Sequence, residues 1–370
     1  MFRKYFYYLK KSDWLLSLVV IFLVVFGLIA IYSIESAAED PTFLNFKKQL
    51  IFFGLGLGLL IFFSLLDYRY LKTYAWVLYG LGLLTMLALL VFGTTIRGTK
   101  GWLFLFGEQG FQPVEMVKIL LIIMVSKCFY DWRGEIGSVK NLAIIFAVVV
   151  PLIALVVLQP DVGSSLVLAT IFLGLLFLVK TNRAYLIGVV VLLIAVAAMS
   201  WFLLLKDYQK ERILTFLDPS RDPWGSGYNI KQSTVAVGSG NLFGRGLGLG
   251  SQSRLNFLPA QETDFIFAVI AEELGFIGSS LLLIFFVVFV YRLIKIARAV
   301  RDDFGLFLLC GLVIYFTAQS VMNVGMNVGM VPIAGVPLPF VSYGGSSLIT
   351  GFIAIGIAQS VYIRQAEKLT

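Results

Sequence analysis

The chain contains no histidine among its 370 residues. This absence excludes Ser-His-Asp and Cys-His catalysis, histidine-ligated haem and zinc sites that use His. Only two cysteines are present, Cys128 and Cys310, far apart and in or beside apolar runs, so neither a disulfide framework nor a metal cluster is expected. Any acid–base chemistry must therefore depend on carboxylates, Lys, Tyr or Cys.

Charge is also scarce. Charged residues make up 14% of the chain against 59% hydrophobic residues, and the mean hydropathy is +0.92. A soluble domain of this length would need more polar surface. Almost uncharged runs of about 18 residues or more recur, each long enough to cross about 30 Å of hydrocarbon. The first run, 14–32, lacks a small-residue cleavage site before Glu35, so a cleaved secretory signal is not expected.

These runs predict an all-α polytopic membrane protein that forms a single domain over residues 1–370. Ten transmembrane helices are expected, at about 14–32, 50–66, 74–93, 114–130, 142–158, 163–180, 184–205, 265–291, 304–324 and 342–363. The alternate connectors and the two ends of the chain hold 17 of the 29 basic residues. By the positive-inside rule, both termini are expected to be cytoplasmic. The net charge of +8 is then an orientation signal and a match to anionic membrane lipid, with no indication of a nucleic-acid partner.

The opposite, exoplasmic face is expected to carry most of the unusual polar chemistry. Its largest element is the loop between spans 7 and 8, residues 206–262. Seven basic and four acidic residues between 206 and 260 give this loop a net charge of +3. Long ordered loops usually carry function. Because nucleotide-activated substrates are absent outside the cell, an enzyme working there must use a substrate that arrives already activated.

Two intramembrane polar groups stand out before the long loop. Glu115 and Lys118 are spaced i, i+3 on one helical face, which fits either a neutralised pair that lets the helix pack or an ion pair lining a cavity. Asp161 stands where a new span begins, so it is either an N-cap or a site residue.

Two glycine-containing stretches favour structural interpretations. GSGNLFGRGLGLGSQS (238–253) fits neither phosphate-loop pattern, and a mobile exoplasmic loop around Arg245 is the preferred interpretation. VMNVGMNVGM (321–330) places Asn323 and Asn327 at i, i+4 beside small residues, which favours helix–helix packing.

The run LPAQETDFIFAVIAEELG (258–275) concentrates carboxylates at the entrance to an apolar segment. On the residues alone, Asp264 is an exposed carboxylate at a helix start. Because 265–291 is too long for an untilted span, 264–271 is expected to extend above the membrane, with Glu272 and Glu273 at the interface.

Four stretches in this order resemble the SEDS family of cell-wall polymerases, and the resemblance covers essentially the whole chain. They are FQPVEMVKI (111–119), QPDVGSS (159–165), the run 227–275 and GVPLPFVSYGGSS (335–347). The stretch from NVGMNVGM to SYGG and the length resemble the elongation branch more than the division branch. One departure is the 97–102 loop, where many relatives carry a basic residue directly before the Trp. Here that position is Gly101, and Lys100 is the candidate substitute.

The resemblance implies a peptidoglycan glycosyltransferase in the bacterial cytoplasmic membrane. Its substrate would be lipid II, a disaccharide-pentapeptide on undecaprenyl pyrophosphate, and its partner a class B penicillin-binding protein transpeptidase. The resemblance makes Asp264 the essential carboxylate and marks Glu115, Lys118, Asp161 and Arg212 as functional cavity positions. It also suggests a divalent cation, Mg²⁺ or Mn²⁺, with no metal-binding signature readable in the sequence; Asp264 would then be a ligand rather than a base.

In the resulting hypothesis, Asp264 is the general base for an inverting sugar transfer. Lys118, Arg212, Arg245 and Lys100 are available to the departing pyrophosphate. Two other classes of function remain open: a flippase or transporter for lipid-linked substrates, and a scaffold in the elongation machinery. No internal repeat of the kind found in many transporters is visible.

Overall fold

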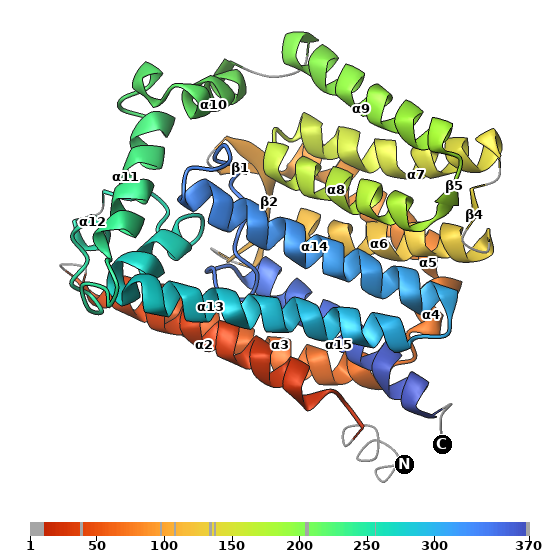
Figure 1. Ribbon diagram of the computed structural model, residues 1–370, viewed down its shortest axis with the longest axis horizontal. Coiled ribbons are helices and arrows are strands. Elements are labelled where there is room, and N and C mark those ends of the chain that lie inside the picture. Colours follow the sequence, from red (N-terminus) through yellow and green to blue (C-terminus); the bar gives the residue numbers. More distant parts are fainter. Residues whose placement is uncertain are drawn as a thin grey trace.

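The computed structural model is a bundle of long helices with a smaller helical group at one end (Figure 1). It describes residues 11–37, 40–96, 98–106, 109–132, 135–136, 138–203, 207–255 and 257–367. The helices before the long loop are α2 (Trp14–Ser36), α3 (Leu44–Leu65), α4 (Arg69–Thr73), α5 (Ala75–Phe92), α6 (Pro113–Asp131), α7 (Val139–Leu158), α8 (Val162–Leu178) and α9 (Arg183–Leu203). Those from the loop onward are α10 (Asp207–Leu217), the 3₁₀ turn η1 (Pro219–Arg221), α11 (Ser226–Ser239), α12 (Ser251–Arg254), α13 (Ile266–Ala299), α14 (Asp303–Asn327) and α15 (Gly345–Glu367).

Each of the ten apolar stretches expected to span the membrane corresponds to a long helix. Among the described residues, seven helices are long and apolar enough to cross a membrane by length and composition: α2, α3, α5, α7, α13, α14 and α15. Helix α8 has 17 residues, and α6 carries Glu115, Lys118, Lys127 and Asp131. The chain is therefore a multi-pass membrane protein by its helices.

Short strands occupy two connectors. Strands β1 (Thr94–Ile96), β2 (Thr99–Phe106) and β3 (Gln109–Phe111) form an antiparallel sheet between α5 and α6. At the other end of the bundle, β4 (Glu135–Ile136) pairs in parallel with β5 (Lys180–Thr181) (Figure 1).

Helix ends follow the local capping chemistry. The carboxylates of Asp13, Asp161 and Asp302 accept a backbone N–H in the first turn of α2, α8 and α14, respectively. Pro113 opens α6, where its missing N–H costs no helical hydrogen bond. Asp161 is thus an N-cap, as one interpretation of the sequence expected.

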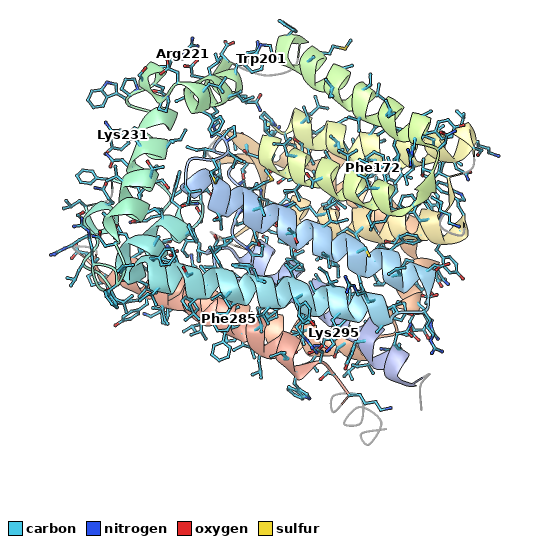
Figure 2. The ribbon with its side chains drawn as sticks, viewed as in Figure 1. Phe172, Trp201, Arg221, Lys231, Phe285 and Lys295 are labelled. Carbon is cyan, nitrogen blue, oxygen red and sulfur yellow. The ribbon has the colours of Figure 1, made fainter. Side chains whose placement is uncertain are left out.

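Helix α14 is central. It packs against α6, α8 and α13, and its inner face buries large side chains such as Tyr315 and Phe316. Helix α15 packs along α3, where a Cβ on Gly356 would lie 2.7 Å from Leu60 O. Only glycine permits this approach of the two backbones. Figure 2 shows the side chains filling the bundle around Phe172, while Lys295 lies toward the outer end of α13.

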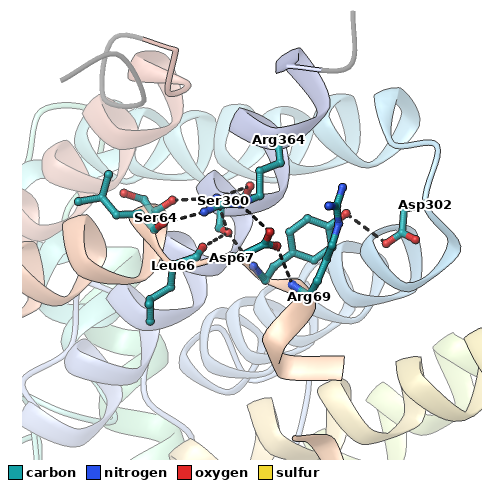
Figure 3. Close-up of polar contacts among 9 residues, drawn as sticks. Ser64, Leu66, Asp67, Arg69, Asp302, Ser360 and Arg364 are labelled. Atoms are coloured by element: carbon teal, nitrogen blue, oxygen red, sulfur yellow. Dashed lines mark hydrogen bonds and ion pairs between the residues drawn. The ribbon is translucent and has the colours of Figure 1, made fainter. Parts of the chain in front are cut away.

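A polar cluster joins the C-terminal ends of α3 and α15 (Figure 3). The Arg364 guanidinium donates to Ser64 O at 3.3 Å and Leu65 O at 2.7 Å, and the Ser360 hydroxyl donates to Leu66 O. These bonds satisfy carbonyls that the last turn of α3 leaves without helical partners. Arg364 therefore caps a neighbouring helix in addition to contributing positive charge at this end.

Candidate active site

Asp264 lies in the tight turn that leads into α13. Its N–H donates to Ala260 O at 3.0 Å, and the side chain is half-buried. A Cβ built on Gly335 would lie 3.9 Å from Asp264 Oδ2. The carboxylate therefore faces the segment 331–344, which is most of the connector between α14 and α15.

Two buried asparagines of α14 hold the main chain of Asp264. Asn327 Nδ2 donates to Asp264 O at 2.9 Å, and Asn323 Nδ2 donates to the same oxygen at 3.1 Å. Both side chains are 0% exposed. Asn323 Nδ2 also donates to Val336 O at 2.8 Å, so one amide joins the segment 331–344 to Asp264.

The segment 331–344 packs between the turn before α13 and the start of α8, and contacts both. Ser342 Oγ donates to Thr263 O at 2.6 Å, and Tyr343 N donates to Glu262 O at 2.8 Å. A Cβ on Gly163, next to the start of α8, would lie only 2.1 Å from Ala334 O. The glycine at 163 is therefore required for this close contact.

Tyr343 lies in the same segment. Burial raises the pKa of its phenol, and the carboxylates of Glu262 and Glu35 raise it further. The phenol is therefore neutral at physiological pH and can act as a hydrogen-bond donor.

Glu115 and Lys118 form a buried ion pair. Lys118 Nζ lies 2.8 Å from Glu115 Oε1, and the side chains are 0% and 1% exposed. Tyr315 of α14 donates to Glu115 Oε2 at 3.4 Å, and Lys118 Nζ lies 5.9 Å from the centre of the Tyr315 ring. The pair is therefore neutralised internally and directed at α14.

Asp161 lies close enough to this pair for the charges of Lys118 and Glu115 to act on its carboxyl group. Its Oδ1 accepts from Ser164 N at 2.9 Å, and Gln112 Nε2 approaches Oδ2 at 3.5 Å. Glu115, Lys118 and Asp161, three of the cavity positions that the resemblance implies, thus lie near one another, and their role in a reaction stays a prediction.

Helix α14 connects the two groups of residues. Tyr315 contacts the ion pair, and Asn323 and Asn327 hold Asp264. At 1.5 Å per residue, Tyr315 and Asn323 are about 12 Å apart along the helix axis. The two groups therefore lie about two helical turns apart along α14.

The adjacent carboxylates Glu272 and Glu273 have structural partners. Glu272 accepts from Gln252 N at 2.9 Å and Ser253 N at 3.1 Å, at the start of α12. Glu273 Oε1 accepts from Ser33 Oγ at 2.8 Å and Gly248 N at 3.1 Å. These two buried side chains fasten the long loop to α13 and α2.

Helix α13 is broken at Gly275, which has φ 67°, and the same loop supplies hydrogen-bond partners for the backbone groups at the break. Arg245 N and Gly246 N donate to the carbonyls of Glu272 and Glu273, and Phe276 N donates to Asn241 O. A Cβ on Gly244 would lie 2.0 Å from Glu273 O. The expectation of a mobile loop around Arg245 is therefore wrong: these glycines allow close backbone docking.

The other three predicted basic residues are not part of the cluster of Glu115, Lys118 and Asp161. Lys100 Nζ donates to Leu90 O near the C-terminal end of α5, where the helix dipole favours a cation. Arg245 is exposed, and its Nε donates to Ser239 O at 3.3 Å. Arg212 is on α10, which packs against η1 and α11 at the end of the molecule (Figure 1).

Comparisons with known proteins agree with this architecture. The family profile of FtsW, RodA and SpoVE, described as cell cycle protein, matches residues 13–367. The chain belongs to this family, the SEDS family. The peptidoglycan glycosyltransferase MrdB of Escherichia coli K12 is 37% identical over 361 residues, covering 95% of this chain and 96% of that protein.

Two solved structures share the SEDS fold with this chain. One, from a study of how a peptidoglycan synthase complex coordinates polymerization and crosslinking, has a TM-score of 0.80 and 32% identity, covering 96% of this chain and 98% of the other. The rod shape determining protein RodA of Thermus thermophilus has a TM-score of 0.70 and 29% identity, covering 95% and 96%.

Several residues of this SEDS member were not assigned a site role from the sequence. The sequence favours helix–helix packing for Asn323 and Asn327, and it assigns no site role to Gln112, Tyr315 or Gly335. The i, i+4 spacing of two amides in an apolar helix was the available signal, since a buried amide needs partners. Their partner, Asp264, is 59 residues from Asn323 in sequence, so no local pattern identifies it.

Proposed function

We propose that this protein is a peptidoglycan glycosyltransferase that polymerises lipid II into glycan strands during cell elongation. The observation that carries the proposal is the fixed placement of Asp264 at the start of α13, between α14 and the segment 331–344. The curated relatives named peptidoglycan glycosyltransferase support the activity. The likeness to RodA supports the role in elongation.

The proposed topology has ten spans, cytoplasmic termini and an exoplasmic loop over 206–262, in the bacterial cytoplasmic membrane. Arg292 is ion-paired with Asp13 near the basic end of α13. At 1.5 Å per residue, α13 rises about 25 Å from Arg292 to its break at Gly275, against about 30 Å of hydrocarbon. Asp264, beyond this break, is proposed to lie toward the exoplasmic end of the bundle, where the sugars of lipid II are expected.

In the proposed reaction, the 4-hydroxyl of one GlcNAc attacks the anomeric carbon of MurNAc on a second substrate. The new C–O bond forms as the bond to undecaprenyl pyrophosphate breaks, with inversion. Asp264 accepts the hydroxyl proton, a role typically worth about 10²–10⁴ in rate. Holding the main chain of Asp264 with two amides favours a constant position for this base.

The departing pyrophosphate carries several negative charges, and fixed positive groups would stabilise it. Lys118 is the buried candidate, with Glu115 and Asp161 setting its orientation and charge balance. Arg212 of the basic loop is the candidate nearer the solvent, while Arg245 and Lys100 would add positive charge at longer range.

A divalent cation, Mg²⁺ or Mn²⁺, is proposed to accompany the substrate. Among the described residues, no group of three or more His, Cys, Asp or Glu side chains could hold a metal. Asp264 nevertheless fits the mode in which one or two carboxylates share Mg²⁺ with substrate phosphates. The ion would supply charge neutralisation at the pyrophosphate, and Asp264 would then be its ligand instead of the base.

A class B penicillin-binding protein transpeptidase is the proposed partner, crosslinking the strands that this chain makes. The similar structure from the peptidoglycan synthase complex supports this pairing, since that complex coordinates polymerization and crosslinking. A flippase, another lipid-substrate transporter or an elongation scaffold are the alternative functions.

Purified protein given lipid II in detergent separates these alternatives. A polymerase produces glycan strands without any membrane potential or second compartment. A transporter or scaffold leaves the lipid II unpolymerised, which would refute the proposal.

A further inference from the structure

The side chain of Asn327 occupies the place of a helical hydrogen bond at the start of α13. In a continuous helix, Asp264 O would accept from Ala268 N. Instead, Ala268 N donates to Asn327 Oδ1 at 3.1 Å, and Asn327 Nδ2 donates to Asp264 O at 2.9 Å. The first regular bond joins Val269 N to Phe265 O. The inserted amide therefore makes α13 begin at Ile266, with Phe265 as its N-cap and Asp264 outside the helix.

The inserted amide is itself held in place. Asn327 Nδ2 donates to Asn323 O at 2.8 Å, and Ser233 Oγ of α11 donates to Asn327 O at 2.7 Å. Asn323 adds a second donor to Asp264 O and joins it to Val336. The contacts on this one carbonyl thus come from α14, which is braced in turn by the long loop.

We propose that Asn327 and Asn323 are positioning residues that keep Asp264 outside α13 and so fix the direction of its carboxylate. Without the Asn327 amide, Asp264 O and Ala268 N can pair directly. That pairing extends the helix by one residue and turns the Asp264 side chain away from Gly335. This inference rests on the proposed function, because it assigns the asparagines to the same reaction.

The test compares Asn327→Leu with Gln359→Met. Gln359 is an equally buried bidentate amide that holds the N–H and carbonyl of Asp13 at the other end of the bundle. Both variants should lower the thermal unfolding temperature, since each removes buried hydrogen bonds. Only Asn327→Leu should lower kcat for lipid II polymerisation, by about 100-fold for a displacement on the order of 1 Å, with KM changed less than threefold.

The inference is overturned if kcat of Asn327→Leu stays within twofold of the parent, or falls no further than that of Gln359→Met. If Asn327→Leu does not fold, Asn323→Leu removes one donor and leaves the Ala268 contact intact. It should lower kcat about tenfold, since misplaced catalytic groups lose rate steeply, and an unchanged kcat again overturns the inference. A parent that does not polymerise lipid II refutes the proposed function instead.

A second, independent observation concerns the depth of the long loop. The Asp13–Arg292 ion pair sets α2 and α13 level at one end, beside the exposed aromatic residues Trp14 and Tyr291. About 20 residues of helix cross about 30 Å of hydrocarbon. Counted from this pair, both helices reach the opposite boundary where Ser33 Oγ donates to Glu273.

The loop residues 241–249 dock at that boundary. Arg245 N and Gly246 N donate to the carbonyls of Glu272 and Glu273. Four large apolar side chains of this stretch are more than half exposed, and exposed Phe276 and Ile277 continue the apolar surface along α13. The four are Leu242, Phe243, Leu247 and Leu249.

We infer that residues 241–249 insert these four side chains among the outer-leaflet acyl chains, with exposed Arg245 at the lipid phosphates. Apolar residues in a loop tied to the membrane boundary gain burial there, and a guanidinium suits phosphate recognition. This inference does not depend on the enzymatic activity.

A spin label placed by Phe243→Cys tests it, with Cys128 and Cys310 changed to Ala and the protein alone in phosphatidylcholine–phosphatidylglycerol vesicles. Arg221→Cys is the control, since Arg221 is 52% exposed on the outer part of the loop (Figure 2). The Phe243 label should collide several-fold more with oxygen, relative to a water-soluble nickel complex, than the control. Equal ratios at both positions would overturn the inference and leave this surface facing water.

Discussion

Separating Glu115 from Lys118 should cost far more than neutralising both. The two side chains are 1% and 0% exposed and 2.8 Å apart, so removing one charge leaves the other buried. Breaking such a pair typically costs about 3–5 kcal/mol, whereas replacing both partners by neutral groups of similar size can cost little. Glu115→Gln and Lys118→Met should each destabilise by that amount, and the double variant by less than either.

The measurement is a double-mutant cycle on the free energy of unfolding, followed by circular dichroism in dodecylmaltoside–SDS micelles. If each single change costs about 3–5 kcal/mol and the double variant less than either, the coupling energy must exceed about 3 kcal/mol, at or above the upper range for residues in contact. The matched control is the Lys127–Asp131 pair of the same helix, whose side chains are 19% and 46% exposed. Exposed pairs contribute about 0.2–1 kcal/mol. Additive effects at 115 and 118, or equal coupling in both pairs, would refute the reasoning.

Three further outcomes are expected. Arg212→Ala should lower turnover more than apparent lipid II affinity, because a positive group at the departing pyrophosphate acts mainly in the transition state; both within about twofold of the parent would reject this role. Gly275→Ala should destabilise the protein strongly, because φ is 67° at this residue and the new Cβ would lie 2.2 Å from Gly244 N. The control Gly58→Ala should not destabilise it, because its new Cβ would have nothing within 4 Å. A chelator should slow polymerisation by the parent, and Mg²⁺ or Mn²⁺ should restore it; unchanged rates would remove the cation from the proposal.

The helices were predictable because membrane crossing imposes a length and a composition that can be counted directly. The Glu115–Lys118 pair and the cap at Asp161 were predictable for a similar reason, since their partners lie within three residues on the same element. Local spacing determines such contacts.

The support around Asp264 was not predictable in this way. A buried asparagine can either pack against a neighbouring helix or form hydrogen bonds with a backbone that is distant in sequence. Asn327 forms such bonds with residues about 60 positions away, so the sequence around it does not identify them. Glycine-rich sequence is equally ambiguous. It permits either mobility or close docking. The break in α13 at Gly275 leaves backbone groups without partners inside the helix, and residues 241–246 dock there because they supply those partners.

The general-base assignment is tested most directly by polymerisation of labelled lipid II with purified Asp264→Asn protein. Asn is nearly isosteric and leaves the Asp264 carbonyl to accept from Asn323 and Asn327 as before, so the unfolding temperature should match that of the parent. Because Asn cannot accept the hydroxyl proton, turnover should fall by about 10² or more. Glycan synthesis within about twofold of the parent rate would contradict the account, since Asp264 would then act neither as base nor as metal ligand.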